Sequence, residues 1–159
     1  MTVRSTARVD LFTLIHKGLR ALLFDLSAAA ARLDVERTDE VDALVARVDR
    51  GLGFLDEHAA HEDRHIMPVL RIVAPAVEAE LAGEHRRLEA LGSQVSELAY
   101  QLASAVAAER PPLAAGLCRL LNALTSGHLA HMEREEAEAN HALWETVDDA
   151  ELLIIMALG

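Results

Sequence analysis

Apolar residues recur at spacings of three and four along most of the chain, the pattern of amphipathic helices. We predict four long helices, over about residues 6–33, 39–72, 76–108 and 111–140, and a short one over about residues 148–157. The links between them are short, which favours antiparallel packing of consecutive helices. The pattern therefore predicts an all-α protein, an up-down-up-down antiparallel four-helix bundle with a short extra C-terminal helix.

Two features interrupt the second of these helices. Gly51 and Gly53 fall inside its apolar pattern, where each should cost about 1 kcal/mol relative to alanine, so we expect a packing reason or a bend there. Pro68 lacks an amide hydrogen and should kink the last turns. We expect one domain over residues 1–159, with a core over about residues 6–145 and a docking helix over about residues 148–157.

Composition narrows the class of protein. Apolar residues make up 52% of the chain but aromatic residues only 3%, which favours helices over sheets. The net charge of −11 argues against a nucleic-acid partner. No apolar run approaches the roughly 18 residues of a membrane span. The single Cys118 cannot form an internal disulfide and the N-terminus lacks a signal-peptide pattern, so a cytoplasmic location is expected.

Several histidines and carboxylates project onto the apolar stripes when the helices are drawn at about 100° per residue. The six candidates for a shared site are His16, His58, Glu62, His85, His131 and Glu135. Of these, His16, His58 and His85 lie on the margins of their stripes, close enough to reach inward. Burying such groups costs several kcal/mol unless their charges and hydrogen bonds are satisfied. A metal ion satisfies both. About four histidines and two carboxylates are enough ligands for two ions, and two ions account for them better than one. Ligands without thiolate indicate iron, manganese or zinc.

Other polar residues are less clearly placed by the same projection. His128 and Glu138 also project inward, whereas His61 and Glu136 project away from the core. His141 is expected on the surface, and Cys118 is assigned no role. The roles of five residues stay open, namely those of His61, His65, His128, Glu84 and Glu89.

The candidate residues resemble the ligand pattern of the hemerythrin-like family, the HHE cation-binding domain. That pattern has a histidine on the first helix, His-x-x-x-Glu on the second, a histidine on the third and His-x-x-x-Glu on the fourth. The matches are His16, His58-x-x-x-Glu62, His85 in Glu84-His85-Arg86, and His131-x-x-x-Glu135, within about residues 10–145. The resemblance implies a four-helix bundle that holds two iron ions as an oxo- or hydroxo-bridged di-iron site.

The chain departs from the oxygen-carrying members of that family at two positions. Glu89 stands where they have a second histidine on the third helix, and their longer step to the fourth-helix carboxylate would select Glu136 instead of Glu135. These departures favour peroxide or nitric oxide chemistry, or sensing, over simple oxygen carriage.

We therefore predict a non-haem di-iron protein that binds oxygen, peroxide or nitric oxide, with catalase-like peroxide turnover as one outcome. Whether it is an enzyme stays open, as does its state as monomer or homodimer. One alternative is an iron-sensing, oxygen-sensing or metal-dependent interaction domain without catalysis. Another is a ferritin-like carboxylate di-iron oxidase, because Glu62-x-x-His65 and Glu138-x-x-His141 match the Glu-x-x-His motif of that class.

Overall fold

The computed structural model describes residues 8–158, and in this part of the chain every regular element is a helix. The predicted all-α class is confirmed. The four long helices are α1 (Thr13–Ala31), α2 (Thr38–His65), α4 (Pro75–Ser104) and α5 (Arg110–Arg134). The shorter elements are α3 (Met67–Val73), a 3₁₀ turn η1 (Ala107–Glu109), a π-helix η2 (Glu135–Ala139), α6 (Asn140–Thr146) and α7 (Asp149–Ala157).

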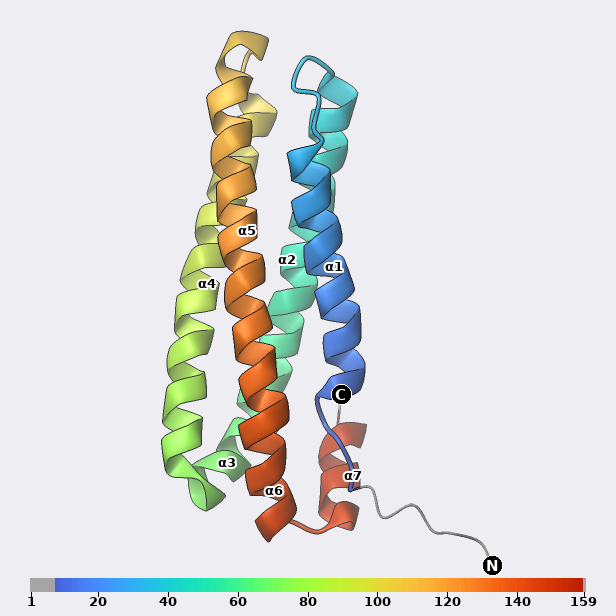
Figure 1. The fold of residues 1–159 in the computed structure, drawn as a ribbon, viewed down its shortest axis with the longest axis vertical. Helices are drawn as coiled ribbons and strands as arrows, with labels where there is room; N and C mark the ends of the chain where they lie inside the picture. Colours follow the sequence, from blue (N-terminus) through green and yellow to red (C-terminus); the bar gives the residue numbers. More distant parts are fainter. Residues whose placement is uncertain (1–7, 159) are drawn as a thin grey trace, which may run out of the picture.

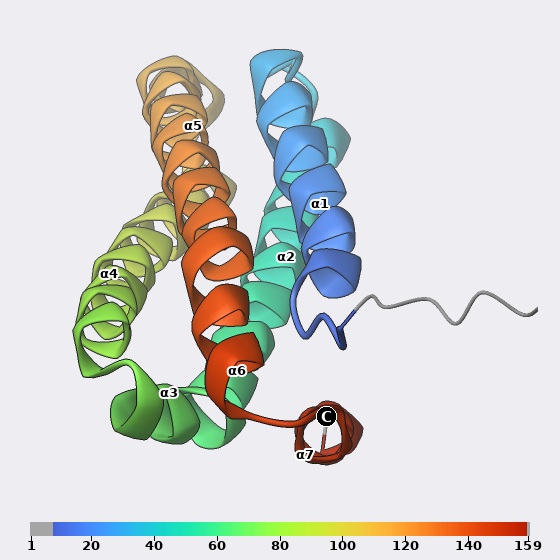
Figure 2. The same ribbon diagram turned by 60° about the horizontal axis from the view of Figure 1, so that its bottom comes forward.

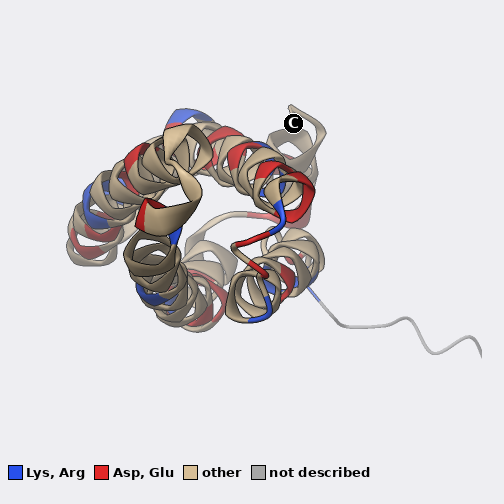
Figure 3. Cartoon of the chain, turned by 90° about the horizontal axis from the view of Figure 1, so that it is seen from above, with Lys and Arg blue, Asp and Glu red and all other residues tan. Residues whose placement is uncertain are grey.

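The long helices run alternately up and down the molecule (Figure 1). Helix α1 packs on α2 and α5, and α4 packs on the same two helices, so that the four surround one interior. In the view along the bundle, acidic and basic positions are spread over the long helices (Figure 3). This arrangement fits the predicted bundle.

The interior consists of two hydrophobic clusters with a polar layer between them. The cluster nearer the α1–α2 loop includes Leu23, Val48, Leu102 and Leu121, and the cluster at the opposite end includes Phe12, Ile66, Leu81 and Leu143. On α1 the buried His16 lies between Phe12 and Leu19, which belong to different clusters. The burial of apolar side chains on both sides of the polar layer therefore stabilises the fold around it.

Helix α2 ends earlier than predicted. The pattern predicts one helix through about residue 72, but α2 ends at His65 and α3 starts at Met67. Pro68 occupies the first turn of α3, where it needs no hydrogen-bond donor, whereas inside a continuous helix its ring would clash with the carbonyl of the preceding turn. Helix α3 then crosses the base of the bundle toward α4 (Figure 2).

Helix α1 begins at Thr13 instead of about residue 6, and residues 6 and 7 lie outside the described part. Asp10 ends the preceding segment, because its Oδ1 accepts hydrogen bonds from the Phe12 and Thr13 amides, both at 2.9 Å. Asn140 donates to the same oxygen at 3.0 Å, which ties the start of α1 to α6. Burial raises the pKa of the Asp10 carboxyl, but these bonds outweigh it and lower that pKa to about 2.

The last predicted long helix becomes a π-helix after Arg134. Helix α5 continues into the π-helix η2, whose wider turn shifts the phase of every later side chain. Glu138, predicted to project inward, is consequently 51% exposed. Helix α7 is the predicted short C-terminal helix. Asp148 caps it by accepting a hydrogen bond from the Glu151 amide at 3.0 Å, and Leu152 is buried in the cluster that includes Phe12. Within the described residues no helix is long and apolar enough to cross a membrane.

The two glycines of α2 have different surroundings, which leads to a stability prediction. A Cβ on Gly51 would lie 2.7 Å from Leu26 Cδ1 in the core, whereas a Cβ on Gly53 would meet no atom within 4 Å. Gly53→Ala should therefore raise the free energy of unfolding by about 0.5–1 kcal/mol through helix propensity. Gly51→Ala should lower it by about 1 kcal/mol, because the buried Leu26 side chain must shift and repack. Urea denaturation measures both, and equal changes would contradict the packing difference.

Candidate metal centre

The polar layer gathers side chains from all four long helices. Helix α1 supplies His16 and α4 supplies His85, while α2 and the junction of α5 with η2 each supply a histidine and a glutamate four residues apart. Residues four apart lie one helical turn from each other on the same face, so each pair points into the layer together. The structure brings together all six residues proposed from the sequence: His16, His58, Glu62, His85, His131 and Glu135.

The six residues divide into two groups of possible metal ligands. His16 and His58 belong to one group, and His85 and His131 to the other. Glu62 and Glu135 belong to both groups, and within each group the donor atoms lie within 4.8 Å of one another. The arrangement therefore offers two adjacent positions for cations that share two carboxylates.

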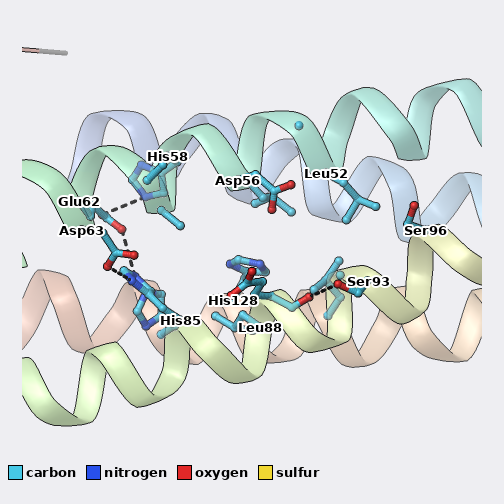
Figure 4. Close-up of a pocket in the computed structure, with 18 of the residues that line it drawn as sticks. Leu52, Asp56, His58, Glu62, Asp63, His85, Leu88, Ser93, Ser96 and His128 are labelled. Carbon is cyan, nitrogen blue, oxygen red and sulfur yellow. Dashed lines mark hydrogen bonds and ion pairs between the residues drawn. The ribbon is translucent and has the colours of Figure 1, made fainter.

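Each shared carboxylate turns one oxygen toward each group. Glu62 Oε1 lies 3.0 Å from His58 Nε2, while its Oε2 lies 3.4 Å from His85 Nε2 (Figure 4). On the opposite side, Glu135 Oε1 lies 3.2 Å from His131 Nε2 and its Oε2 lies 3.4 Å from His16 Nε2. A carboxylate that divides its oxygens in this way is suited to bridge two ions.

Five donor atoms of this layer are buried and make no hydrogen bond in the part of the chain that the structure describes, whereas His16 Nε2 and His58 Nε2 lie 3.2 Å from each other. Among the described residues, the buried side-chain atoms without a partner include both oxygens of Glu62, both oxygens of Glu135 and Nε2 of His85. Leaving such atoms unpaired costs free energy, and charged groups cost most. Cations at the two positions would satisfy all five atoms at once, so the residues present fit a two-metal centre.

Three of the histidines are held in place by carboxylates outside the layer. The distance from His16 Nδ1 to Glu136 Oε1 is 2.9 Å, and from His131 Nδ1 to Glu84 Oε2 it is also 2.9 Å. Asp63 Oδ1 lies 2.8 Å from His85 Nδ1 (Figure 4). A carboxylate at Nδ1 orients the ring and leaves Nε2 directed inward, as is usual for metal-binding histidines.

Charge within the layer shifts its pKa values. Burial raises the pKa of the Glu62 carboxyl, but the imidazoles of His16, His58 and His85 outweigh burial and hold that pKa well below its ordinary value. Burial likewise lowers the pKa of His85, but the neighbouring carboxylates of Glu135, Glu62 and Asp63 raise it to about 10. Without a cation, protonated imidazole compensates the buried carboxylates, and a metal would displace those protons.

The π-helix explains a difference from the sequence prediction. Glu136, predicted to project away from the core, is only 25% exposed and lies against α1, where Arg20 donates to it at 2.7 Å. Because η2 has a wider turn than an α-helix, Glu135 enters the layer while Glu136 reaches His16 from outside. Amphipathic projection assumes a regular helix and could not have found this arrangement.

The other open residues lie around the layer and not in it. Neither His61 nor His65 belongs to a ligand group, and their rings pack against each other at 4.9 Å between centroids. His61 is less exposed than predicted, since its Nε2 is buried. His141 lies on the surface as predicted, with 67% of its side chain exposed. Glu84, whose role the sequence left open, contacts His131 from α4.

One side of the layer is open to a groove of about 850 Å³ between α2 and α4. His58 and Glu62 reach it from α2 and His85 from α4, whereas neither His16 nor Glu135 lines it. In Figure 4 these residues lie at one end of the groove, and His128 lies further along it. This groove therefore gives small molecules access to the layer.

The fold and this layer define a class: a helical bundle with a buried histidine and carboxylate cluster suited to metal ions. Comparison with protein-family models matches residues 7–143 to the hemerythrin HHE cation-binding domain. The match covers most of the chain, and the protein belongs to the hemerythrin family, as the sequence predicted. A comparison with curated proteins finds no match.

Proposed function

We propose that the chain is a non-haem di-iron protein that binds oxygen, peroxide or nitric oxide at the layer between its two hydrophobic clusters. The observation that carries the proposal is the sharing of Glu62 and Glu135 between two ligand groups, with all four of their oxygens otherwise unpartnered. Family membership supports metal binding, and ligands without thiolate are suited to iron. Manganese and zinc would fit the same donors.

The donor count supports binding of small ligands. Each group contributes two imidazoles and one oxygen from each of two glutamates. Octahedral coordination uses six donors, so each ion would have positions left for a small ligand. Bound iron would supply redox chemistry and Lewis acidity. The residues of the chain orient the metal, exclude bulk water by the apolar packing on either side, and admit ligands through the α2–α4 groove.

Metal analysis and an optical spectrum of the purified protein test this proposal together. We expect about two iron ions per chain and, after oxidation, charge-transfer absorption that changes on addition of peroxide or nitric oxide. The proposal would be ruled out if the protein holds no iron after purification and reconstitution. It would also be ruled out if none of these ligands changes the spectrum.

The same residues could serve sensing without catalysis. Steady peroxide decomposition at stoichiometric iron would favour an enzyme, whereas inert iron-loaded protein whose helix content collapses on chelation would favour a sensor. The ferritin-like alternative is disfavoured, because Glu138 and His141 are largely exposed while His16 lies in the layer.

A further inference from the structure

The α2–α4 groove is lined by acidic residues from both helices. Among the described residues that line it there are, besides the proposed ligand Glu62, five further carboxylates and neither lysine nor arginine. The five belong to Asp49, Asp56, Asp63, Glu89 and Glu97. The groove therefore has a negative potential that attracts cations and repels anions.

Two of these carboxylates oppose each other without a counter-charge. Asp56 on α2 and Glu89 on α4 take part in no ion pair within the described residues, and both are exposed to solvent. Burial raises the pKa of the Asp56 carboxyl, and the negative charge of Glu89 raises it further. A cation between them would relieve that repulsion.

A buried imidazole without a partner lines the same groove. His128 of α5 is 9% exposed, lines the groove, and makes no hydrogen bond or ion pair within the described chain. In Figure 4 it lies between the end of the groove that holds His58 and Glu62 and the end marked by Ser93. Burial and the nearby imidazoles lower its pKa to about 4, so its nitrogen lone pair is free to bind a cation.

Two glycines line the groove between α2 and α4. A Cβ on Gly92 of α4 would meet only Leu52 Cδ2, at the ordinary contact distance of 3.6 Å, and Gly53 faces open space across the groove. No large side chain at these two positions closes the passage between α2 and α4.

We infer that the α2–α4 groove is the route by which divalent cations enter the metal centre, with Asp56 and Glu89 drawing the ion from solvent and His128 passing it to His58 and Glu62. The inference rests on the proposed function, since it requires that the layer holds metal. Neutral oxygen or peroxide would gain nothing from the carboxylates. The acidic lining is therefore best explained by passage of a cation.

The rate of Fe²⁺ uptake tests the route. The full-length chain is stripped of metal, its helix content is checked by circular dichroism, and it is mixed with Fe²⁺ without oxygen. A chelator stops uptake at successive times, and protein-bound iron is measured. In the Asp56→Asn/Glu89→Gln variant, uptake should slow about tenfold at low ionic strength and approach the wild-type rate at high ionic strength. The final iron content should match that of the wild type, because the six ligands are unchanged.

The control variant Glu36→Gln/Asp42→Asn removes two exposed negative charges that do not line the groove, and it should load like the wild type. His128→Ala widens the groove, so slower loading at both ionic strengths would reflect the lost imidazole and not a blockage. Equal rates for the wild type, the acidic variant and His128→Ala would overturn the route. Failure of the wild type to retain iron would instead overturn the proposed function, and the final iron content distinguishes the two.

Discussion

Glu62→Gln is expected to remove both metal ions from the protein, whereas His58→Ala should remove mainly one. Glu62 belongs to both ligand groups and directs one oxygen toward each, while His58 belongs to a single group. Glutamine keeps the size of the side chain but loses its negative charge, and its amide nitrogen cannot bind a cation. Glu135→Gln should behave like Glu62→Gln, because Glu135 is shared in the same way.

Metal content after equilibrium dialysis, together with calorimetric titration, measures this difference. We expect the affinity of both positions to fall by more than about 100-fold in Glu62→Gln, which exceeds the usual loss when a residue only orients a ligand. Glu133→Gln, a matched change at an exposed position of α5, should bind metal like the wild type. Retention of two tightly bound ions by Glu62→Gln would show that this carboxylate is not a shared ligand.

Removal of metal is expected to lower the free energy of unfolding by several kcal/mol. The ligands converge only in the folded chain, since they come from four helices separated in sequence. At free metal about 1,000 times above the dissociation constant, each ion should stabilise the fold by about 4 kcal/mol. Urea denaturation with metal and with chelator measures the increment, and at the same metal concentration it should be much smaller in Glu62→Gln.

The increment should grow as pH rises. The pKa of His85 is raised from 6.5 to about 10 in the metal-free fold, so its protonated form stabilises that fold below pH 6.5, and the contribution is lost as pH rises toward 10. Protons compete with metal for the same nitrogen, so metal binding strengthens over the same range. Identical denaturation midpoints with and without metal at every pH would contradict a centre built from these residues.

Local patterns were sufficient for the helices and for the choice of candidates. The spacing of apolar residues depends only on the 3.6-residue helical repeat, and the same repeat identifies His58 with Glu62 and His131 with Glu135 as pairs on one face. The missing amide hydrogen of Pro68 predicted a kink in the last turns of the second helix, but it did not show that α2 ends before this residue.

Features that depend on departures from the regular helix were not predictable in this way. The π-helix after Arg134 moves Glu138 to the surface and brings Glu136 against His16. Such a wide turn is rare, and the projection of side chains assumes a regular α-helix throughout. The projection was therefore wrong for Glu136 and Glu138.

The sequence by itself determined that this protein is helical and which six side chains are candidates for a shared metal centre, because both follow from periodicity along single helices and from the cost of burying charge. Only the tertiary structure decided that the two glutamates face both pairs of histidines, that Asp63, Glu84 and Glu136 hold the imidazoles, and that an acidic groove leads to them. These features depend on the register and rotation of one helix against another, which side-chain packing across the whole bundle determines.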